Sequence, residues 1–206
     1  MKAMKFKAHP WHGINPGKNC PQELRCFIEV VPGDQMKYEI DKESGYLKVD
    51  RPNLYSSVVP LLYGFIPMTY SADASAEYCM KQTGIKNLKG DGDPLDIIVL
   101  SDRYIPRGDL IVEAVPIGGL RMIDKNETDD KLLAVLKGDQ TYGQFSDISQ
   151  IPRALIKRIK HYFLTYKNDP ETDSDYIVDI AGEYGKEEAY EVINAGLKDY
   201  NNYFGQ

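Results

Sequence analysis

Residues 89–100 read KGDGDPLDIIVL and place three carboxylates, Asp91, Asp93 and Asp96, within a stretch of six residues. Carboxylates this close disfavour one another's ionisation. The apolar residues 97–100 that follow are typical of a buried β-strand. The sequence therefore predicts an acidic cluster at the entrance to a buried strand. An interaction that offsets the repulsion between these carboxylates is needed to stabilise it.

The backbone around the cluster favours convergence of the three carboxylates. In a regular strand Asp91 and Asp93 would share one face and Asp96 would point to the other. Gly92 and Pro94 break that regularity, because glycine adopts unusual φ values and proline does not join a ladder. Converged carboxylates need a counter-charge, and oxygen ligands of this kind select Mg²⁺, Mn²⁺ or Ca²⁺.

The cluster could instead be a solvated loop or the start of an EF-hand. Three acids in a loop are often simply solvated, although two backbone breakers and an adjoining strand argue against this here. An EF-hand loop also begins D-x-D, but Asp96 occupies the sixth position, where glycine is needed.

A second acidic group follows the apolar stretch GGLRMID and contains Asp124, Asp129 and Asp130, with Lys131 next to them. Alone, it is typical of a solvated turn between strands. Combined with the first group, it provides enough carboxylate for two or more cations.

Basic side chains complete the chemistry that the sequence suggests. Strand alternation in KYEID places Lys37 and Glu39 on one face, VDRP supplies Arg51, and Lys167 follows a predicted helix. Singly, each is more typical of a surface charge. Together, cations for anionic oxygens and acids for metal ions are the equipment of phosphoryl transfer.

Composition limits the classes of protein that remain. The chain has 206 residues, 42% hydrophobic and 27% charged, which fits one globular domain spanning residues 1–206. Between Asp91 and Asp130 acids outnumber bases by six, which equals the net charge of the whole chain, −6. We expect no nucleic-acid partner on this charge, and no membrane span or secretory signal. Three cysteines without a C-x-x-C pair favour a reducing, cytoplasmic location.

The order of apolar patterns predicts a β-rich fold with helices. The sequence predicts an irregular N-terminal arm at residues 1–22 and a long connecting excursion at residues 68–90. Helical spacing of apolar residues predicts helices within 151–166 and 189–200. Short strands are predicted at residues 24–31, 37–41, 46–50, 94–100, 109–124, 131–136 and 175–185.

With these segments in place, the chain resembles the family I soluble inorganic pyrophosphatases. The strongest match is DGDPLD at residues 91–96, and the resemblance extends over about residues 24–170. The other matching segments, in order, are FIEV (27–30), KYEIDKESG (37–45), VDRP (49–52), YGFIP (63–67), MIDKNETDDK (122–131) and HYFLTYK (161–167).

This resemblance implies a fold, a reaction and a set of residue roles. The implied fold is mainly β with helices: a five-stranded closed OB-type β-barrel flanked by two main α-helices. The implied reaction is Mg²⁺-dependent hydrolysis of inorganic diphosphate to two phosphates, which keeps diphosphate low so that biosynthetic reactions run forward. Several Mg²⁺ ions are expected, with Mn²⁺ as a substitute. The resemblance also implies a homo-oligomer, for which a hexamer is favoured.

The resemblance further implies a role for each matching site residue, by its position in the sequence. These roles are Asp93 as the catalytic base, Asp91, Asp96, Asp124 and Asp129 as metal ligands, Lys37, Arg51, Tyr63, Lys131, Tyr166 and Lys167 as substrate-binding residues, and Glu29 and Glu39 as outer-shell residues.

The physical chemistry of the cluster agrees with these roles. Diphosphate is a polyanion, which the acids would repel unless cations reversed the local charge. Three rival functions remain: another metal phosphohydrolase acting on nucleotides, a barrel that binds single-stranded nucleic acid, and a calcium-binding structural domain. The sequence offers no glycine-rich nucleotide loop for the first, and its acidity disfavours the second.

The chain departs from the family pattern at three places. Val59 stands where the family commonly has a second tyrosine, four positions before Tyr63. Lys125 follows Asp124 where an acid is often found, which would weaken a peripheral metal site. The connection from Tyr63 to Asp91 is longer than in compact bacterial members.

Overall fold

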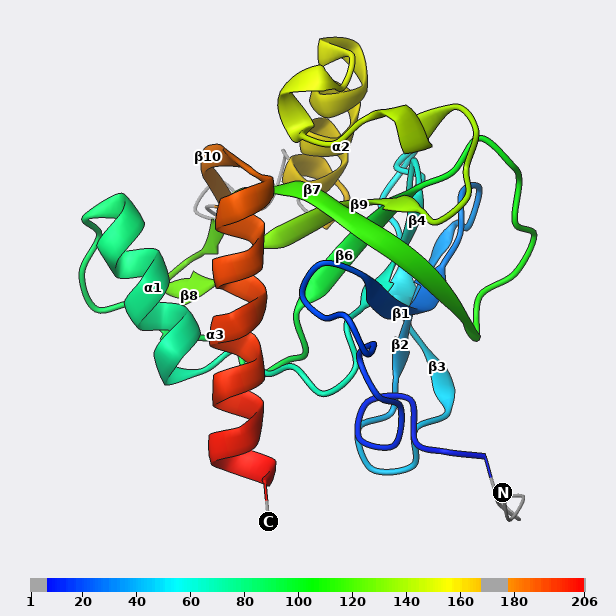
Figure 1. The fold of residues 1–206 in the computed structure, drawn as a ribbon. Helices are drawn as coiled ribbons and strands as arrows, with labels where there is room; N and C mark the ends of the chain where they lie inside the picture. The colour runs from blue at the N-terminus through cyan, green and yellow to red at the C-terminus, as the bar shows by residue number, and fades with distance from the viewer. Residues whose placement is uncertain (1–6, 168–177, 206) are drawn as a thin grey trace.

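Short β-strands dominate the part of the chain described by the computed structural model, residues 7–167 and 178–205. The fold is mainly β with three α-helices (Figure 1). The strands are β1 (Leu24–Val30), β2 (Met36–Ile40), β3 (Leu47–Pro52), β4 (Leu62–Phe65), β5 (Lys89–Gly90), β6 (Asp96–Leu100), β7 (Leu110–Asp124), β8 (Glu127–Thr128), β9 (Lys131–Leu136) and β10 (Val178–Gly185). The helices are α1 (Asp73–Thr83), α2 (Arg153–Thr165) and α3 (Lys186–Phe204), with short 3₁₀ turns η1 (Tyr142–Gln144) and η2 (Ile148–Gln150).

Five strands pair in a ring, in the order β1–β4–β6–β9–β7 and back to β1. The parallel pair in this ring is β6–β9, and the other four pairs are antiparallel. Strand β7 makes the return possible because its 15 residues are long enough to pair with β1 at one end and with β9 further along, while its far end pairs with β10 outside the ring. Its register with β9 shifts between Pro116 and Gly118, where a Cβ on Gly118 would lie 2.4 Å from the Tyr184 carbonyl oxygen.

Strand β6 is buried on both faces, which explains its unbroken apolar run. Ile98 and Leu100 belong to a core cluster that includes apolar residues of α2. Ile97 and Val99 belong to a second cluster that includes apolar residues of α3. A strand covered on both sides reads as a continuous hydrophobic stretch. The acidic residues at its start therefore sit on a firmly held strand.

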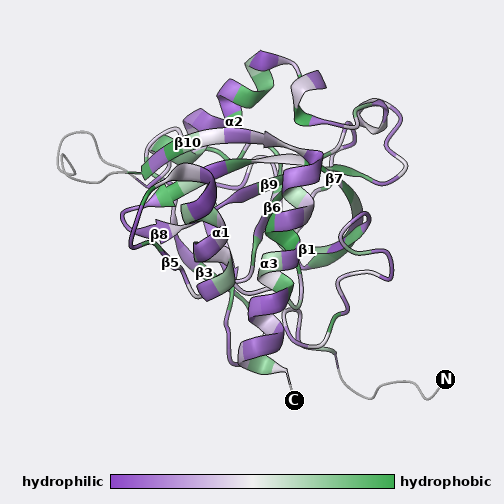
Figure 2. Ribbon diagram, turned by 60° about the vertical axis from the view of Figure 1, so that its left-hand side comes forward, coloured by the Kyte–Doolittle hydropathy of each residue, from purple (hydrophilic) through white to green (hydrophobic). Residues whose placement is uncertain are grey.

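The two predicted helices form as α2 and α3, but the expectation of two main helices was incomplete. Helix α3 packs along β7 and against the additional helix α1, and hydrophilic and hydrophobic residues alternate along it (Figure 2). Helix α1 lies inside the predicted connecting excursion. Its first turn is held by Asp199 of α3, whose carboxylate accepts hydrogen bonds from the N–H groups of Ala72, Ala74 and Ser75 at 2.8–3.0 Å.

Each of the predicted strands is present, as β1, β2, β3, β6, β7, β9 and β10. The first three residues of the predicted segment 175–185 lie outside the described residues. The prediction missed β4 and the two-residue strands β5 and β8. Residues 7–23 form turns and bends without a helix or strand. Within the ranges the structure describes, no helix combines the length and the apolar character needed to cross a membrane.

Candidate active site

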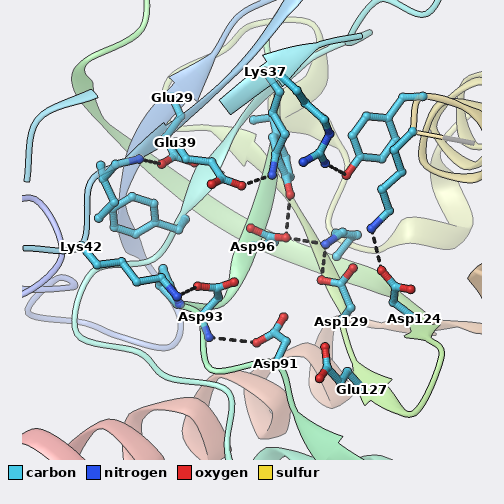
Figure 3. Close-up of a pocket in the computed structure, with 18 residues that line it drawn as sticks. Glu29, Lys37, Glu39, Lys42, Asp91, Asp93, Asp96, Asp124, Glu127 and Asp129 are labelled. Carbon is cyan, nitrogen blue, oxygen red and sulfur yellow. Dashed lines mark hydrogen bonds and ion pairs between the residues drawn. The ribbon is translucent and has the colours of Figure 1, made fainter. Parts of the chain in front are cut away.

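A cavity of about 270 Å³ opens at the end of the strand ring. It brings together every residue to which the family resemblance assigned a role, although these residues come from segments distant in the sequence (Figure 3). Their chemical roles stay predictions. The cavity is lined by Glu29, Lys37, Glu39, Ile40, Lys42, Arg51, Tyr63, Phe65, Asp91, Asp93, Pro94, Asp96, Asp124, Glu127, Asp129, Lys131, Tyr166 and Lys167.

The backbone of Ser71 holds the acidic loop that precedes β6. A Cβ on Gly90 would lie 2.2 Å from the Ser71 carbonyl oxygen, so this approach requires glycine. Gly92 has a φ of +75°, and its N–H donates to the same carbonyl oxygen at 3.0 Å. The Ser71 N–H donates to the Asp93 carbonyl oxygen at 2.8 Å, and the Asp93 N–H donates to the Asp91 carboxylate at 3.0 Å. These bonds hold the kinked loop from which both carboxylates reach the cavity.

The floor of the cavity is a buried cluster centred on Lys131. Its ammonium forms ion pairs with Asp96 and Asp129, and the Tyr63 hydroxyl donates to Asp96 at 2.6 Å. Burial opposes the charge of Lys131, but Asp129 and Asp96 outweigh it and raise the lysine pKa well above its ordinary value. Burial and the neighbouring Asp96 also raise the pKa of Tyr63. At neutral pH Lys131 is therefore a cation and Tyr63 a hydrogen-bond donor.

Cationic groups from β2 and β3 form one wall. Lys37 pairs with Glu39 and lies 3.4 Å from Asp50. Arg51 donates to the Tyr166 hydroxyl at 3.4 Å and lies 5.6 Å from the centre of that ring. The antiparallel register of β2 and β3 places Lys37 opposite Arg51. The wall can therefore present two cations and a phenol to one anionic ligand.

The remaining predicted residues lie at the edges of the cavity. Lys167, after the end of α2, forms an ion pair with Asp124 at 2.6 Å. Glu29 is buried and accepts a hydrogen bond from the Ile40 N–H at 2.7 Å. Burial raises the pKa of Glu29 to about 8, although that hydrogen bond favours the ionised form. Glu29 is thus a largely protonated carboxyl group near neutral pH.

Asp91 shows the electrostatic cost of the cluster. Burial raises the pKa of its carboxyl group to about 8, and Asp129, Asp93 and Asp96 add to the rise. Lys131 offsets these effects only in part. Protein cations near Asp91 therefore do not compensate for its burial among other acids.

Sequence reasoning missed two charged residues of the cavity, Lys42 and Glu127. Lys42 lies in the turn between β2 and β3 and forms an ion pair with Asp93. Glu127 lies opposite Asp124 in the register of β7 and β8 and pairs with Lys89 at 3.1 Å. Both lie within segments that match the family pattern, KYEIDKESG (37–45) and MIDKNETDDK (122–131), but the resemblance assigned them no role, and only the tertiary structure shows that they line the cavity.

Three other positions do not line the cavity. Asp130, counted with the second acidic group, faces away and pairs with buried Arg121 at 3.0 Å. Val59 is buried in the α2-side core cluster and does not contribute a hydroxyl. Lys125 has a φ of +59° in the turn between β7 and β8.

The donor set fits hard divalent cations. Carboxyl groups outnumber lysine and arginine side chains in the lining by eight to five, and oxygen ligands of this type suit Mg²⁺ and Mn²⁺. In residues 7–167 and 178–205, no three His, Cys, Asp or Glu side chains converge as a preformed metal cage. Instead, Asp93, Asp96, Asp124 and Asp129 are each paired with a lysine.

Comparison with known proteins gives one consistent result. A model of the family described as inorganic pyrophosphatase matches residues 26–201. An inorganic pyrophosphatase of Chlamydia trachomatis is 48% identical over 200 residues, covering 96% of each chain. Soluble inorganic pyrophosphatase 2 of Chlamydomonas reinhardtii is 39% identical, covering 96% of this chain and 91% of the relative. The crystal structure of inorganic pyrophosphatase from Thermus thermophilus superposes with a TM-score of 0.78 at 30% identity, covering 94% of this chain and 99% of the other.

Proposed function

The chain belongs to the inorganic pyrophosphatase family, and from that premise we propose that it hydrolyses inorganic diphosphate to two phosphates with the aid of Mg²⁺. One observation carries the proposal: a single cavity joins a carboxylate-rich side to a wall of lysine, arginine and tyrosine side chains (Figure 3). The first side suits divalent cations, and the second suits phosphate oxygens.

Asp91, Asp96, Asp124 and Asp129 would hold the Mg²⁺ ions, with Mn²⁺ as a substitute. Bound Mg²⁺ would supply charge neutralisation of diphosphate and a lower pKa for water. Lys131 pairs with Asp96 and Asp129, and Lys167 pairs with Asp124, so these two lysines reduce the repulsion among three of the four acids. A cation would also offset the burial and the neighbouring acids that raise the pKa of Asp91.

Asp93 would act as the general base that accepts a proton from the attacking water. Its side chain is 49% exposed, so water reaches it, and it lies at the same cavity as the proposed metal ligands. Its ion-pair partner Lys42 comes from the exposed turn between β2 and β3. A positioned general base typically contributes about 10²–10⁴-fold to the rate.

The remaining wall would bind and orient diphosphate. Lys37, Arg51 and Lys167 offset the charge that builds on the departing phosphate, and the Tyr166 hydroxyl donates a hydrogen bond. Lys131 and Tyr63 would bind the anion from the floor, where they also hold Asp96. In the outer shell, Glu39 orients Lys37, and Glu29 fixes the start of the β2–β3 turn through the Ile40 N–H.

Family membership also supports proposals about the whole molecule. We propose that the five-strand ring is a closed barrel of the OB type, since β1 pairs with β7 and completes the ring. We further propose a cytoplasmic homo-oligomer, with a hexamer as the favoured form. Its cellular role would be to keep diphosphate low, so that reactions releasing diphosphate proceed forward.

The direct test is phosphate release by the purified chain from a panel of diphosphate, triphosphate, ATP and a phosphate monoester. We expect rapid release from diphosphate with Mg²⁺, none with EDTA, and slow release from the other compounds. Preference for ATP would favour the nucleotide phosphohydrolase. An absence of release from all four substrates with Mg²⁺ would overturn the enzymatic proposal.

A further inference from the structure

We propose that His9 and Trp11, in the N-terminal arm (residues 7–22), are positioning residues for Asp93. The inference rests on the proposed function, because it assigns these residues to the same reaction. Neither side chain lines the cavity. Each nevertheless holds one of two loops that meet at Asp93, so the arm fixes this carboxylate from two directions.

Trp11 holds the first loop. Its side chain is 3% exposed, and its Nε1–H donates to the Thr69 carbonyl oxygen at 2.8 Å. The Met68 N–H donates back to the Trp11 carbonyl oxygen at 2.9 Å, so the arm and the loop are bonded in both directions. The Thr69 hydroxyl accepts the Leu95 N–H at 2.9 Å. Trp11 thereby supports Thr69, whose hydroxyl holds Leu95 at the end of the acidic loop.

His9 holds the second loop, the β2–β3 turn that presents Lys42. Its Nε2 lies 3.2 Å from the Lys42 carbonyl oxygen, and its Nδ1 lies 3.1 Å and 3.3 Å from the N–H groups of Trp11 and His12. A neutral ring with its hydrogen on Nε2 satisfies all three bonds. The turn packs closely on this ring, since a Cβ on Gly45 would lie 2.8 Å from His9 Cδ2.

The two loops meet at Asp93. Lys42 forms an ion pair with its carboxylate, and the N–H of Ser71, two residues after Thr69, donates to its carbonyl oxygen at 2.8 Å. One loop therefore restrains the side chain and the other restrains the backbone. A general base must be held within a fraction of an ångström of its working position. Loosening either loop should lower turnover without removing any group that contacts substrate.

The test compares Trp11→Phe, which keeps an aromatic ring but loses the Nε1–H, with His9→Ala. We expect each variant to lower kcat roughly tenfold and to leave KM within about twofold, because the diphosphate-binding side chains are untouched. The control is Asn19→Ala, which removes an exposed arm contact to Glu23 and should leave kcat unchanged. Hydrogen exchange should be faster in peptides containing residues 69–71 and 92–95 of the Trp11 variant.

A double-mutant cycle separates positioning from general damage. In an Asp93→Asn background, Trp11→Phe should lower the residual kcat by less than about twofold, because residues that act through one group are not additive. Equal losses in both backgrounds would overturn the inference, as would wild-type kcat in both arm variants. If one variant does not fold, the other carries the cycle. Failure of wild-type protein to hydrolyse diphosphate would instead reject the proposed function, so the two failures are distinguishable.

Discussion

Asp96 and Lys131 lie directly opposite each other on the parallel strands β6 and β9, and their side chains form an ion pair at the floor of the cavity. Asp129, two residues before Lys131, pairs with the same ammonium. One buried lysine therefore allows two partly buried aspartates to coexist. This relationship explains part of how the acidic cluster is tolerated, and bound cations would explain the rest.

Replacing Lys131 with methionine should destabilise the metal-free protein. The substitution keeps a long apolar side chain but leaves two partly buried carboxylates, 23% and 17% exposed, without their cation. Breaking a fully buried pair typically costs about 3–5 kcal/mol, and we expect a smaller loss here because solvent reaches both carboxylates. Urea unfolding at pH 7 in EDTA measures the loss, and added Mg²⁺ should recover part of it. Lys157→Met, at an exposed position of α2, is the matched control. Equal unfolding midpoints for both variants would contradict the role of Lys131.

Asp93→Asn should abolish most turnover while the protein stays folded. We expect kcat to fall by about 10²–10⁴-fold, because asparagine keeps the size of the side chain but accepts no proton. Mg²⁺ binding, measured by calorimetry, should change little. Asp91→Asn should show the reverse pattern, a raised Mg²⁺ requirement with a smaller loss of kcat at saturating Mg²⁺. The assigned roles would be wrong if the two variants behaved alike.

Gly90→Ala should damage the site through its backbone. The new Cβ would lie 2.2 Å from the Ser71 carbonyl oxygen, a backbone atom that cannot turn away. The acidic loop would have to move, so both kcat and the thermal midpoint should fall. Gly143→Ala is the control, because its Cβ would meet no atom within 4 Å. Wild-type kcat in Gly90→Ala would show that the loop tolerates displacement.

The dependence of stability on pH can be predicted for Glu183, which joins β10 to α2. Hydrogen bonding from Arg153, assisted by Lys160, lowers the Glu183 pKa from 4.5 to about 2. As pH falls below about 4.5, the unfolded chain takes up this proton first, so the stabilisation is complete above that pH and is lost towards pH 2.

Urea unfolding of Glu183→Gln tests the predicted direction in which stability changes with pH. The midpoint of the variant should lie below that of wild type at pH 6, and the two should converge as the pH approaches 2. Glu187→Gln, at an exposed position of α3, should track wild type throughout. A gap that widened on acidification would mean that the pairing of Glu183 does not persist in solution.

The fold was predictable where local pattern and tertiary environment agree. Alternating or continuous apolar runs identified seven strands, and helical spacing identified α2 and α3. Strand β4 escaped prediction because it has four residues, all of them buried, and so shows no alternation of polar and apolar side chains. Helix α1 escaped because its periodicity is weak and its first turn is held by Asp199, more than one hundred residues away in the sequence.

The residues of the candidate site can also be divided into those that the sequence could predict and those that it could not. Residues inside recognisable motifs, such as Asp91 and Lys131, could be nominated from the sequence because their spacing carries chemical meaning. Lys42 and Glu127 lie in the same matching segments but could not be nominated, since a charged residue in or beside a turn is usually solvated and only the tertiary structure shows that these two line the cavity. The sequence of the arm predicts only irregular structure, and the contacts of Trp11 with the loop at Thr69 become visible only in three dimensions.

The central claim is that divalent cations turn an acidic cavity into a receptor for diphosphate. Its most direct test is calorimetric titration of the purified chain with methylenediphosphonate, a diphosphate analogue that is not hydrolysed, in Mg²⁺ and in EDTA. We expect strong binding in Mg²⁺ and little or none in EDTA. Equal affinity in the two buffers would contradict the claim, because the lysines and arginine alone would then be sufficient to bind the anion.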